Sequence, residues 1–409
     1  MLTLTPLAAL PSVVAQHHDN AVSQLEQRAR LATELRSTLK HLARFDERLE
    51  ANLDGLRIVG STAIEFEQAA IANDPLAAGV VALLLAESDS NQPDAAAQAV
   101  SLLRLENPEI RQAAWWGLRL ASPRHMEPHL HTLLGKSKRD FASAAALAIL
   151  AFHRLPAQTD LGDLADGESE EVAWLLAEAG GRMPGTWDGA RFKQFMSKPS
   201  IRVREAALRA SARSGIPELL TWCREAASQS NAAALESISF LGVVGSQDDL
   251  MLLQRAASSP ETANAAVSAL GRLGLPDSVP ALLDLLEVPT SAEAAAAAVQ
   301  RITSLAVPRC APPQPPAELS EEERDLWEPT LPVDVPLTRD WWKSNQGRFN
   351  REKRWQFGLS VSDDPLGPVF DQLPLAVRYD VYLRQRALVP GTPDWELETW
   401  TWKQKRPTS

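Results

Sequence analysis

Apolar positions recur along the middle of the chain with a period of about 30 residues. Each copy holds a turn-forming residue, and the positions seven before it and eight after it are apolar. A period of this length, with apolar faces on both sides of a turn, is typical of helix-turn-helix units stacked in an α-solenoid. The turn positions are Asn91, Ser122, His153, Pro184, Gly215, Gly245 and Gly274.

Three sets of equivalent positions form the predicted core of this array. Positions +8 and +11 share one face of the second helix, and no single copy could bury that face alone. We therefore predict an all-α fold built as an α-solenoid of about seven helix-turn-helix repeats. The sets are Leu84, Trp115, Ala146, Ala177, Leu208, Ile238 and Val267 at −7; Ala99, Leu130, Leu161, Phe192, Cys223, Leu253 and Leu282 at +8; and Leu102, Leu133, Leu164, Phe195, Ala226, Ala256 and Leu285 at +11.

The residues before the array are predicted to cap it. Residues 1–20 lack a regular pattern, and from 20 to 53 apolar residues recur at spacings of three and four. This spacing predicts one long amphipathic helix or a helical hairpin, which Gly55 would end, followed by a helix over 62–72. The predicted domains are a helical cap at 1–73 and the repeat array at 74–306, whose last helix covers 290–305.

The chain changes character after the array. Eight prolines between 307 and 337 exclude long helices and predict a linker. Residues 338–409 form a Trp-rich module with helices from Arg339, capped by Thr338 and ended by Gly347, and over 374–388. About 70 residues form an independent core with difficulty, so we expect the module to fold back onto the C-terminal repeats.

Composition narrows the class of protein. The chain has 409 residues, 45% hydrophobic and 23% charged, and a net charge of −11. This balance opposes non-specific binding to nucleic acid or to anionic membranes. Two cysteines fit a reducing compartment. No apolar run is long enough to span a membrane, and the start lacks the basic residues of a signal peptide, so we expect a cytoplasmic protein.

Candidate catalytic and metal-binding residues all have simpler interpretations. His125, His129 and His131 fit a solvated helix face, and Cys223 falls at a core position. Asp248-Asp249 and Asp363-Asp364 lie near turns, where Asp caps helices. The chain has no phosphate loop, dinucleotide-binding glycine motif, nucleophile elbow, zinc motif or CxxC pair. We predict a protein that is not an enzyme, with no catalytic, cofactor or metal site.

Residues 339–357 combine five aromatic with six basic and two acidic side chains. One interpretation is an aromatic docking segment or protein interface whose arginines pair with the acidic array. The other is a platform for single-stranded nucleic acid. The net charge favours docking, so the predicted partner-binding residues are Trp341, Trp342, Phe349, Arg354 and Trp355.

The repeats resemble HEAT repeats, with Arg111 and Arg204 where such repeats often carry arginine. Three parts together resemble a bacterial family encoded in type VI secretion gene clusters. They are the stretch from Phe45 to Leu56 (FDERLEANLDGL), the array, and a terminal module with Trp341-Trp342, Asn345, Phe349, Arg354, Gly358 and Tyr379. Family members tend to have Tyr where this chain has Trp355. The resemblance implies no catalytic residues.

The leading functional hypothesis is a protein-binding HEAT-repeat adaptor, chaperone or scaffold. The resemblance implies a type VI secretion effector or spike component as its partner. An alternative role as an immunity protein that masks a toxin is consistent with the same extended repeat surface. Two other classes remain open. One is an enzyme on a HEAT scaffold, similar to bilin lyases or to DNA glycosylases; for a glycosylase, Trp115, Trp116 and Trp222 would supply the aromatic side chains. The other is a nucleic-acid binder.

Overall fold

The structure is a computed structural model that describes residues 11–31, 34–88, 94–136, 140–157, 169–183, 185–229, 231–312, 331–361 and 369–404. It is predominantly helical, as predicted. The chain divides into two compact units. Unit 1 is Met1–Pro217, Pro374–Tyr379 and Arg386–Ser409, and unit 2 is Glu218–Leu373 and Asp380–Gln385. None of the described helices is both long and apolar enough to cross a membrane.

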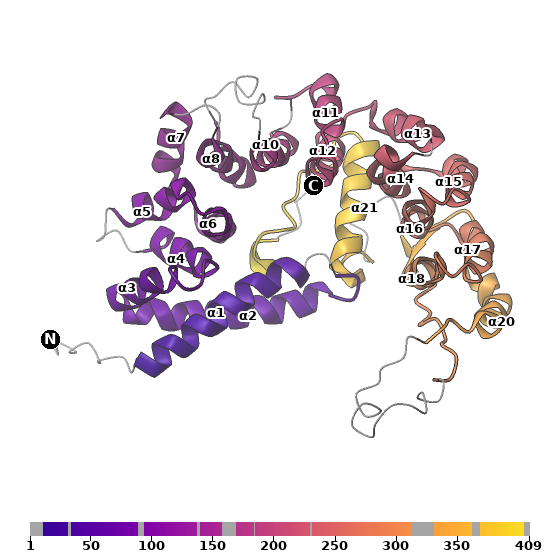
Figure 1. Ribbon diagram of the computed structural model, residues 1–409, viewed down its shortest axis with the longest axis horizontal. Coiled ribbons are helices and arrows are strands. Elements are labelled where there is room, and N and C mark those ends of the chain that lie inside the picture. Colours follow the sequence, from indigo (N-terminus) through magenta and orange to yellow (C-terminus); the bar gives the residue numbers. More distant parts are fainter. Residues whose placement is uncertain are drawn as a thin grey trace, which may run out of the picture. The chain divides into compact units, whose positions relative to one another are not determined.

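Unit 1 begins with an antiparallel hairpin of two long helices (Figure 1). The first, α1 (Pro11–Leu31), starts within the stretch predicted to be irregular, because proline at the first helical turn costs no hydrogen bond. The second, α2 (Leu39–Val59), runs past Gly55, so the predicted end there is wrong. A Cβ on Gly55 would lie 2.7 Å from the His17 ring, so this glycine permits the close approach of α1. The short α3 (Ser61–Ala70) follows.

The other helices of unit 1 form two layers. In one layer, α4 (Ala77–Ala86), α6 (Pro108–Leu120), α8 (Phe141–Phe152), α10 (Glu170–Arg182) and α12 (Ile201–Ser214) each pack on the next (Figure 1). The shorter α5 (Ala95–Ser101), α7 (Glu127–Lys136) and α11 (Gly189–Met196) cover them on the other side. Each helix lies where the period predicts one. The second helix of the third copy, with Leu161 and Leu164, lies outside the described residues, as do Asn91 and Pro184.

Unit 2 continues the same pattern. Here α14 (Leu235–Val244), α16 (Ala263–Leu273) and α18 (Ala292–Thr303) pack in order. They are covered by α13 (Leu219–Gln229), α15 (Leu250–Ala257) and α17 (Val279–Leu285). Gly274 ends α16 with a φ of 71°, as Gly215 ends α12 of unit 1 with a φ of 67°, and glycine adopts this left-handed conformation readily. Gly245 differs, because its φ is −69°.

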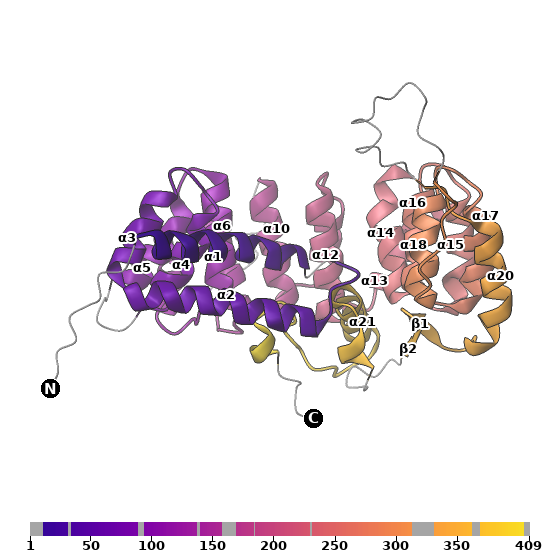
Figure 2. The ribbon, with the colours of Figure 1, turned by 90° about the horizontal axis from the view of Figure 1, so that it is seen from below.

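The C-terminal region adds elements to both units. In unit 2, α20 (Val335–Asn345) lies beside α17, and the hairpin β1 (Arg354–Gln356) and β2 (Leu359–Val361) contacts α18 (Figure 2). Asp334, not Thr338, caps α20, because Pro336 fits its first turn. The hairpin was not predicted. The residues of α21 (Leu375–Leu388), which was predicted, are divided between the units.

The predicted core agrees with the structure at two of its three position sets. Every described residue of the −7 and +8 sets is buried, including Trp115 and Cys223. The +11 set is mixed, because Leu102, Ala226 and Leu285 are only half-buried. The hydrophobic period therefore identified the faces that meet between helices and missed how far each short second helix is covered.

Replacing Leu253 by Ala tests this register. Leu253 is fully buried in α15, and truncating a buried leucine leaves a cavity, so we expect a loss of about 3 kcal/mol in the free energy of unfolding. The control is Met251→Ala in the same helix, since Met251 is 69% exposed. Urea unfolding measures both variants. Equal stability of the two variants would place Leu253 outside the core.

Candidate functional site: an arginine row and the C-terminal strap

Three buried arginines stand at matching places in the first layer of unit 1. Arg119, Arg182 and Arg213 each lie in the last turn of their helix, α6, α10 and α12. We call these three residues the arginine row. A cation is favoured at a helix C-terminus by the helix dipole, but a buried charge also needs a partner. All three side chains are at most 5% exposed, so partners are required.

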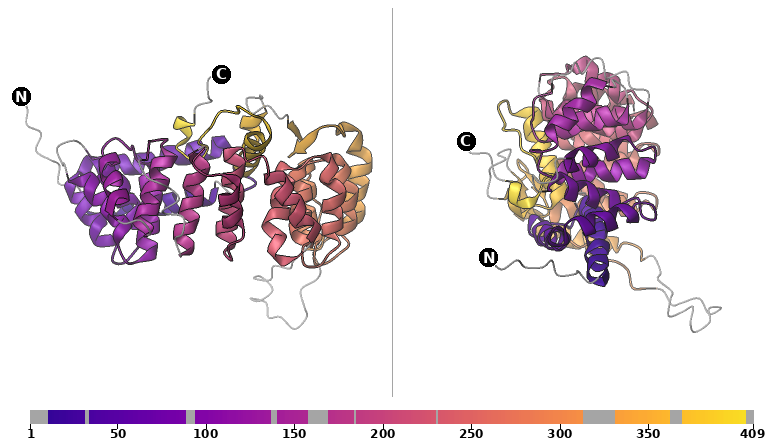
Figure 3. Two further views of the ribbon diagram at one scale, coloured as in Figure 1. Left: turned by 90° about the horizontal axis from the view of Figure 1, so that it is seen from above. Right: turned by 90° about the vertical axis from the view of Figure 1, so that its left-hand side faces the viewer.

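The partners come from residues 392–404, which we call the strap. Its acidic residues 394, 396 and 398 alternate with apolar ones, and in an extended chain alternate side chains point to opposite sides. The acidic set meets the arginine row, while Trp395 and Leu397 are buried. Figure 3 shows the C-terminal segment across the ends of the unit 1 helices.

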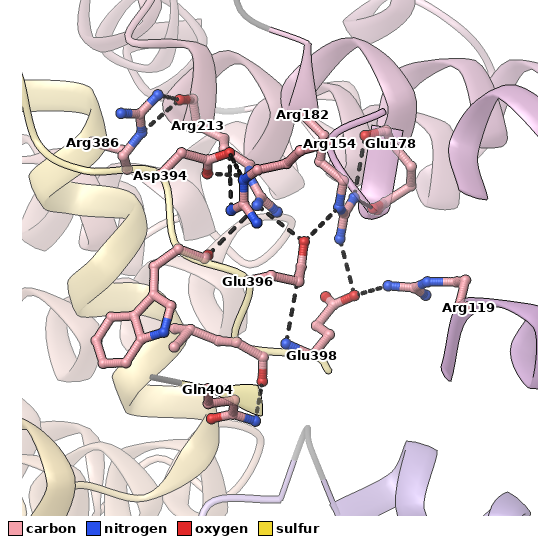
Figure 4. Close-up of polar contacts among 12 residues, drawn as sticks. Arg119, Arg154, Glu178, Arg182, Arg213, Arg386, Asp394, Glu396, Glu398 and Gln404 are labelled. Carbon is pink, nitrogen blue, oxygen red and sulfur yellow. Dashed lines mark hydrogen bonds and ion pairs between the residues drawn. The ribbon is translucent and has the colours of Figure 1, made fainter. Parts of the chain in front are cut away.

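Each carboxylate of the strap joins two arginines (Figure 4). Asp394 pairs with Arg213 at 3.0 Å and with Arg154 at 3.2 Å. Glu396 lies 3.0 Å from Arg213 and 2.9 Å from Arg182. Glu398 lies 3.0 Å from Arg182 and also pairs with Arg119. The result is a chain of bridges that links α6 to α10 and α10 to α12.

The helical hairpin at the start of unit 1 holds the far end of the strap. Arg28 of α1 and Asp46 of α2 form a buried ion pair at 2.8 Å. Arg28 donates to the carbonyls of Glu398 and Thr399, at 3.1 and 2.8 Å. Asp46 accepts the backbone N–H of Thr401 at 2.8 Å. Asp46 lies in the stretch from Phe45 to Leu56, and its carboxylate therefore ties α2 to the strap.

Trp400 supplies the largest apolar contact of this end. Its side chain is 2% exposed, and its indole N–H donates to the carbonyl of Leu120 at 2.8 Å. Leu120 is the last residue of α6, so the hydrogen bond satisfies one of the carbonyls that a helix C-terminus leaves open. The Trp400 ring stacks on Trp402, with centroids 4.7 Å apart.

The arginine row holds nearby carboxylates in their charged form. Burial raises the pKa of Glu396, but the attraction of Arg182 and Arg213 outweighs it and holds that pKa well below its usual range. Glu178, on α10, shows the same balance: burial raises its pKa, and Arg182, Arg209 and Arg119 lower it to about 2. The site is therefore a network of fixed charges rather than a proton donor or acceptor near neutral pH.

The residues predicted to bind a partner lie in unit 2 and contact its own core. Trp342 and Phe349 are buried with ring centroids 5.4 Å apart, and Phe349 meets Trp355 at 4.9 Å. Trp341, on α20, is half-buried. The structure thus brings three of the four predicted aromatic residues into one cluster, and whether they also bind a partner stays a prediction.

Arg354 completes the docking of this segment. Its guanidinium donates to carbonyls in the last turns of α14 and α16, at distances of 2.7–3.3 Å: Gly242, Val243, Arg272 and Leu273. A cation there donates hydrogen bonds to carbonyls that the helix ends leave without a partner, and it interacts favourably with the negative ends of the helix dipoles. Nearby, Arg339 pairs with Asp284 at 2.9 Å and Glu287 at 3.1 Å. This use of the basic and aromatic side chains favours the docking interpretation over a nucleic-acid platform.

The C-terminal region therefore folds back in two directions. Residues 339–357 lie on the C-terminal repeats, as expected. The strap instead lies on the helices α6, α10 and α12, and the expectation is wrong there. A signal for the strap was available in the sequence: arginine stands two or three residues before the turn positions Ser122, Pro184, Gly215 and Gly274, and acidic residues alternate in DWELE.

The remaining candidate residues are the histidines, Cys223 and the aspartate pairs. Among the described residues, no cluster of His, Cys, Asp and Glu could hold a metal ion. Cys223 is buried, and burial with the nearby charge of Asp249 raises its thiol pKa to about 12. Asp249 accepts the backbone N–H of Ser246 at 2.8 Å and pairs with Arg224 at 2.6 Å. Asp363 and Asp364 lie outside the described residues.

No protein-family model matches the chain, and no curated protein sequence matches it.

Proposed function

We propose that the protein is a HEAT-like α-solenoid of about seven repeats that acts as a protein-binding adaptor, chaperone or scaffold. The support is the repeated packing of equivalent helices within each unit, with the same −7 and +8 positions buried in successive copies. Stacked repeats of this kind create extended surfaces, and proteins use such surfaces to bind other proteins.

The observation that carries the proposal is the strap. In a solenoid each repeat contacts only its neighbours, so the stack bends easily. Glu398 contacts both Arg119 of α6 and Arg182 of α10, which are separated in the layer by α8. The strap therefore joins helices that do not pack directly on each other. A surface held in one shape loses less conformational entropy when a partner binds, so the strap suits a preorganised scaffold.

The family resemblance suggests which partners to test first. If the chain belongs with proteins encoded beside type VI secretion genes, a secreted effector or a spike component is the natural partner. The proposal does not depend on this assignment, because the strap and the repeated surface suit protein binding in general.

Capture from the native host tests the proposal. The full chain with an N-terminal tag is crosslinked in cells, purified and analysed by mass spectrometry beside Arg104→Met and Arg182→Met variants. Arg104 is exposed, so its variant is the matched control. We expect the wild type and the control to capture the same partner, and the complex to form again from the purified proteins. We expect Arg182→Met to capture less of this partner, at a temperature where circular dichroism shows that the variant is folded. Recovery of nucleic acid, or of no protein above a tag-only sample, would refute the proposal.

A further inference from the structure

An open groove in unit 1 is lined by residues outside the arginine row and the strap. It has a volume of about 480 Å³ and is walled by α1, α6 and the turn before α4. Its floor is mostly apolar, with Leu25 and Ala29 from α1, Leu76 from the turn and Trp116 from α6. Leu76 is 40% exposed, so part of this apolar surface meets solvent.

The spacing of the wall residues matches the face of a helix. On α1 the lining positions are 22, 25, 26 and 29, and on α6 they are 109, 112, 113 and 116. Both sets have the spacing i, i+3, i+4 and i+7, which is one stripe over two helical turns. Two such stripes form the trough that an additional helix fills when it packs across its neighbours.

The rim of the groove is acidic. Glu26, Asp74 and Glu109 line it, and no Lys or Arg is among its described lining residues. Glu26 pairs with Arg30 on its own helix, and Asp74 accepts the N–H of Leu76 at 2.9 Å. Glu109 is exposed and lies in the first turn of α6. An occupant with basic residues beside an apolar stripe would complement this rim.

We propose that this groove binds a basic amphipathic helix of a partner protein. The inference rests on the proposed function and gives it a partner chemistry: apolar side chains enter between α1 and α6, and lysine or arginine side chains meet Glu26, Asp74 and Glu109. Because the carboxylates lie at a solvent-exposed rim, their attraction weakens as salt concentration rises.

The test uses a fluorescein-labelled amphipathic peptide of about 14 residues, with leucine at i, i+3, i+4 and i+7 and lysine elsewhere. Fluorescence anisotropy measures its binding to the full chain. We expect Glu26→Lys with Glu109→Lys to weaken binding at least about tenfold. Ala29→Phe, which fills the groove without changing charge, should do the same. The control is Glu218→Lys with Glu225→Lys, an equal change in charge at exposed positions of another part of the chain, and it should change binding less than about twofold.

Each other outcome overturns the inference. If the control double variant weakens binding as much as the Glu26→Lys, Glu109→Lys variant, the peptide binds through the overall charge of the protein and not through the groove. If a peptide with glutamate in place of lysine binds equally well, the rim plays no part. A dimer in sedimentation that Ala29→Phe abolishes would make a second copy of the chain the occupant. Because Ala29→Phe leaves all charges in place, it keeps the test valid if the double charge reversal unfolds the protein.

The cellular capture separates this inference from the proposed function. A partner that the Ala29→Phe variant still captures would overturn the groove inference and leave protein binding intact. Failure of the wild-type chain to capture any partner would count against the proposed function itself.

Discussion

Replacing Arg182 by Met lowers the free energy of unfolding by about 5 kcal/mol, at the upper end of the loss expected when a buried ion pair loses one partner. The effect is large because Arg182 pairs with Glu178, Glu396 and Glu398, and the first two carboxylates are themselves nearly buried. The variant leaves these buried carboxylates with fewer cationic partners, because among the described residues only Arg213 then remains paired with Glu396 and only Arg209 with Glu178. Urea unfolding followed by circular dichroism measures the loss.

Two comparisons make the Arg182 result specific. Arg104→Met removes an exposed arginine from the same unit and should change stability by less than about 0.5 kcal/mol. Adding Glu396→Gln to Arg182→Met should cost less than the sum of the single changes, since removing both charges avoids an unpaired one. Additive losses would show that the two side chains do not interact.

Acidification should destabilise the protein by at least about 6 kcal/mol between neutral pH and pH 2, in two stages. The first stage belongs to His153, whose Nε2 is buried and has no hydrogen-bond partner among the described residues. Burial, assisted by Lys403 and Arg119, lowers its pKa from 6.5 to about 4, although a backbone hydrogen bond at Leu118 and the charge of Glu396 oppose the shift.

The sign follows from proton binding. Between pH 6.5 and 4 the unfolded chain protonates His153 and the folded chain does not, so stability falls as pH falls through this window, by about 3 kcal/mol in total. His153→Gln should remove this stage, and His125→Gln, at an exposed position, should keep it. An unchanged slope in the His153 variant would contradict the assignment.

The second stage belongs to the carboxylates of the site. The folded-state pKa of Glu178 is about 2 against 4.5 for a free side chain, and that of Glu396 is lowered in the same direction. Their stabilising effect is complete above pH 4.5 and is lost as pH falls toward 2, with about 3 kcal/mol from Glu178 alone. The pH dependence of urea unfolding measures both stages. A flat profile between pH 4.5 and 2 would contradict the buried ion pairs.

The helices and their buried faces could be predicted because local spacing controls them. Trp115, Leu208 and Ile238 recur at one position of the period, and each is buried where its helix packs on other helices of its own unit. The helix over 374–388 followed from Pro374 and an amphipathic spacing, and α21 covers Leu375–Leu388. The predicted seven-repeat array across the whole chain stays a prediction.

The sequence contains both sides of the strap contact, but it does not show that they meet, because the partners are far apart along the chain. Arg119 and Glu398 are separated by 279 residues, and Arg28 meets Thr399 across 371. Hydrophobic periodicity carries no information about such pairs. The aromatic residues at 341–355 stand out in the sequence by their composition. The acidic residues 394, 396 and 398 gain a function only from their contacts with the arginine row, which the sequence does not show.

Hydrogen exchange of the full chain, followed by mass spectrometry, tests the strap most directly. The backbone N–H groups of Thr401 and Gln404 are bonded to Asp46 and to the carbonyl of Trp400. We predict that amides in residues 398–404 exchange on the order of a hundredfold more slowly than in the same sequence as a free peptide. In Arg182→Met they should exchange faster, while the helix that contains Leu253 is unchanged. Exchange at the free-peptide rate in the wild-type chain would contradict the strap and with it the preorganised scaffold.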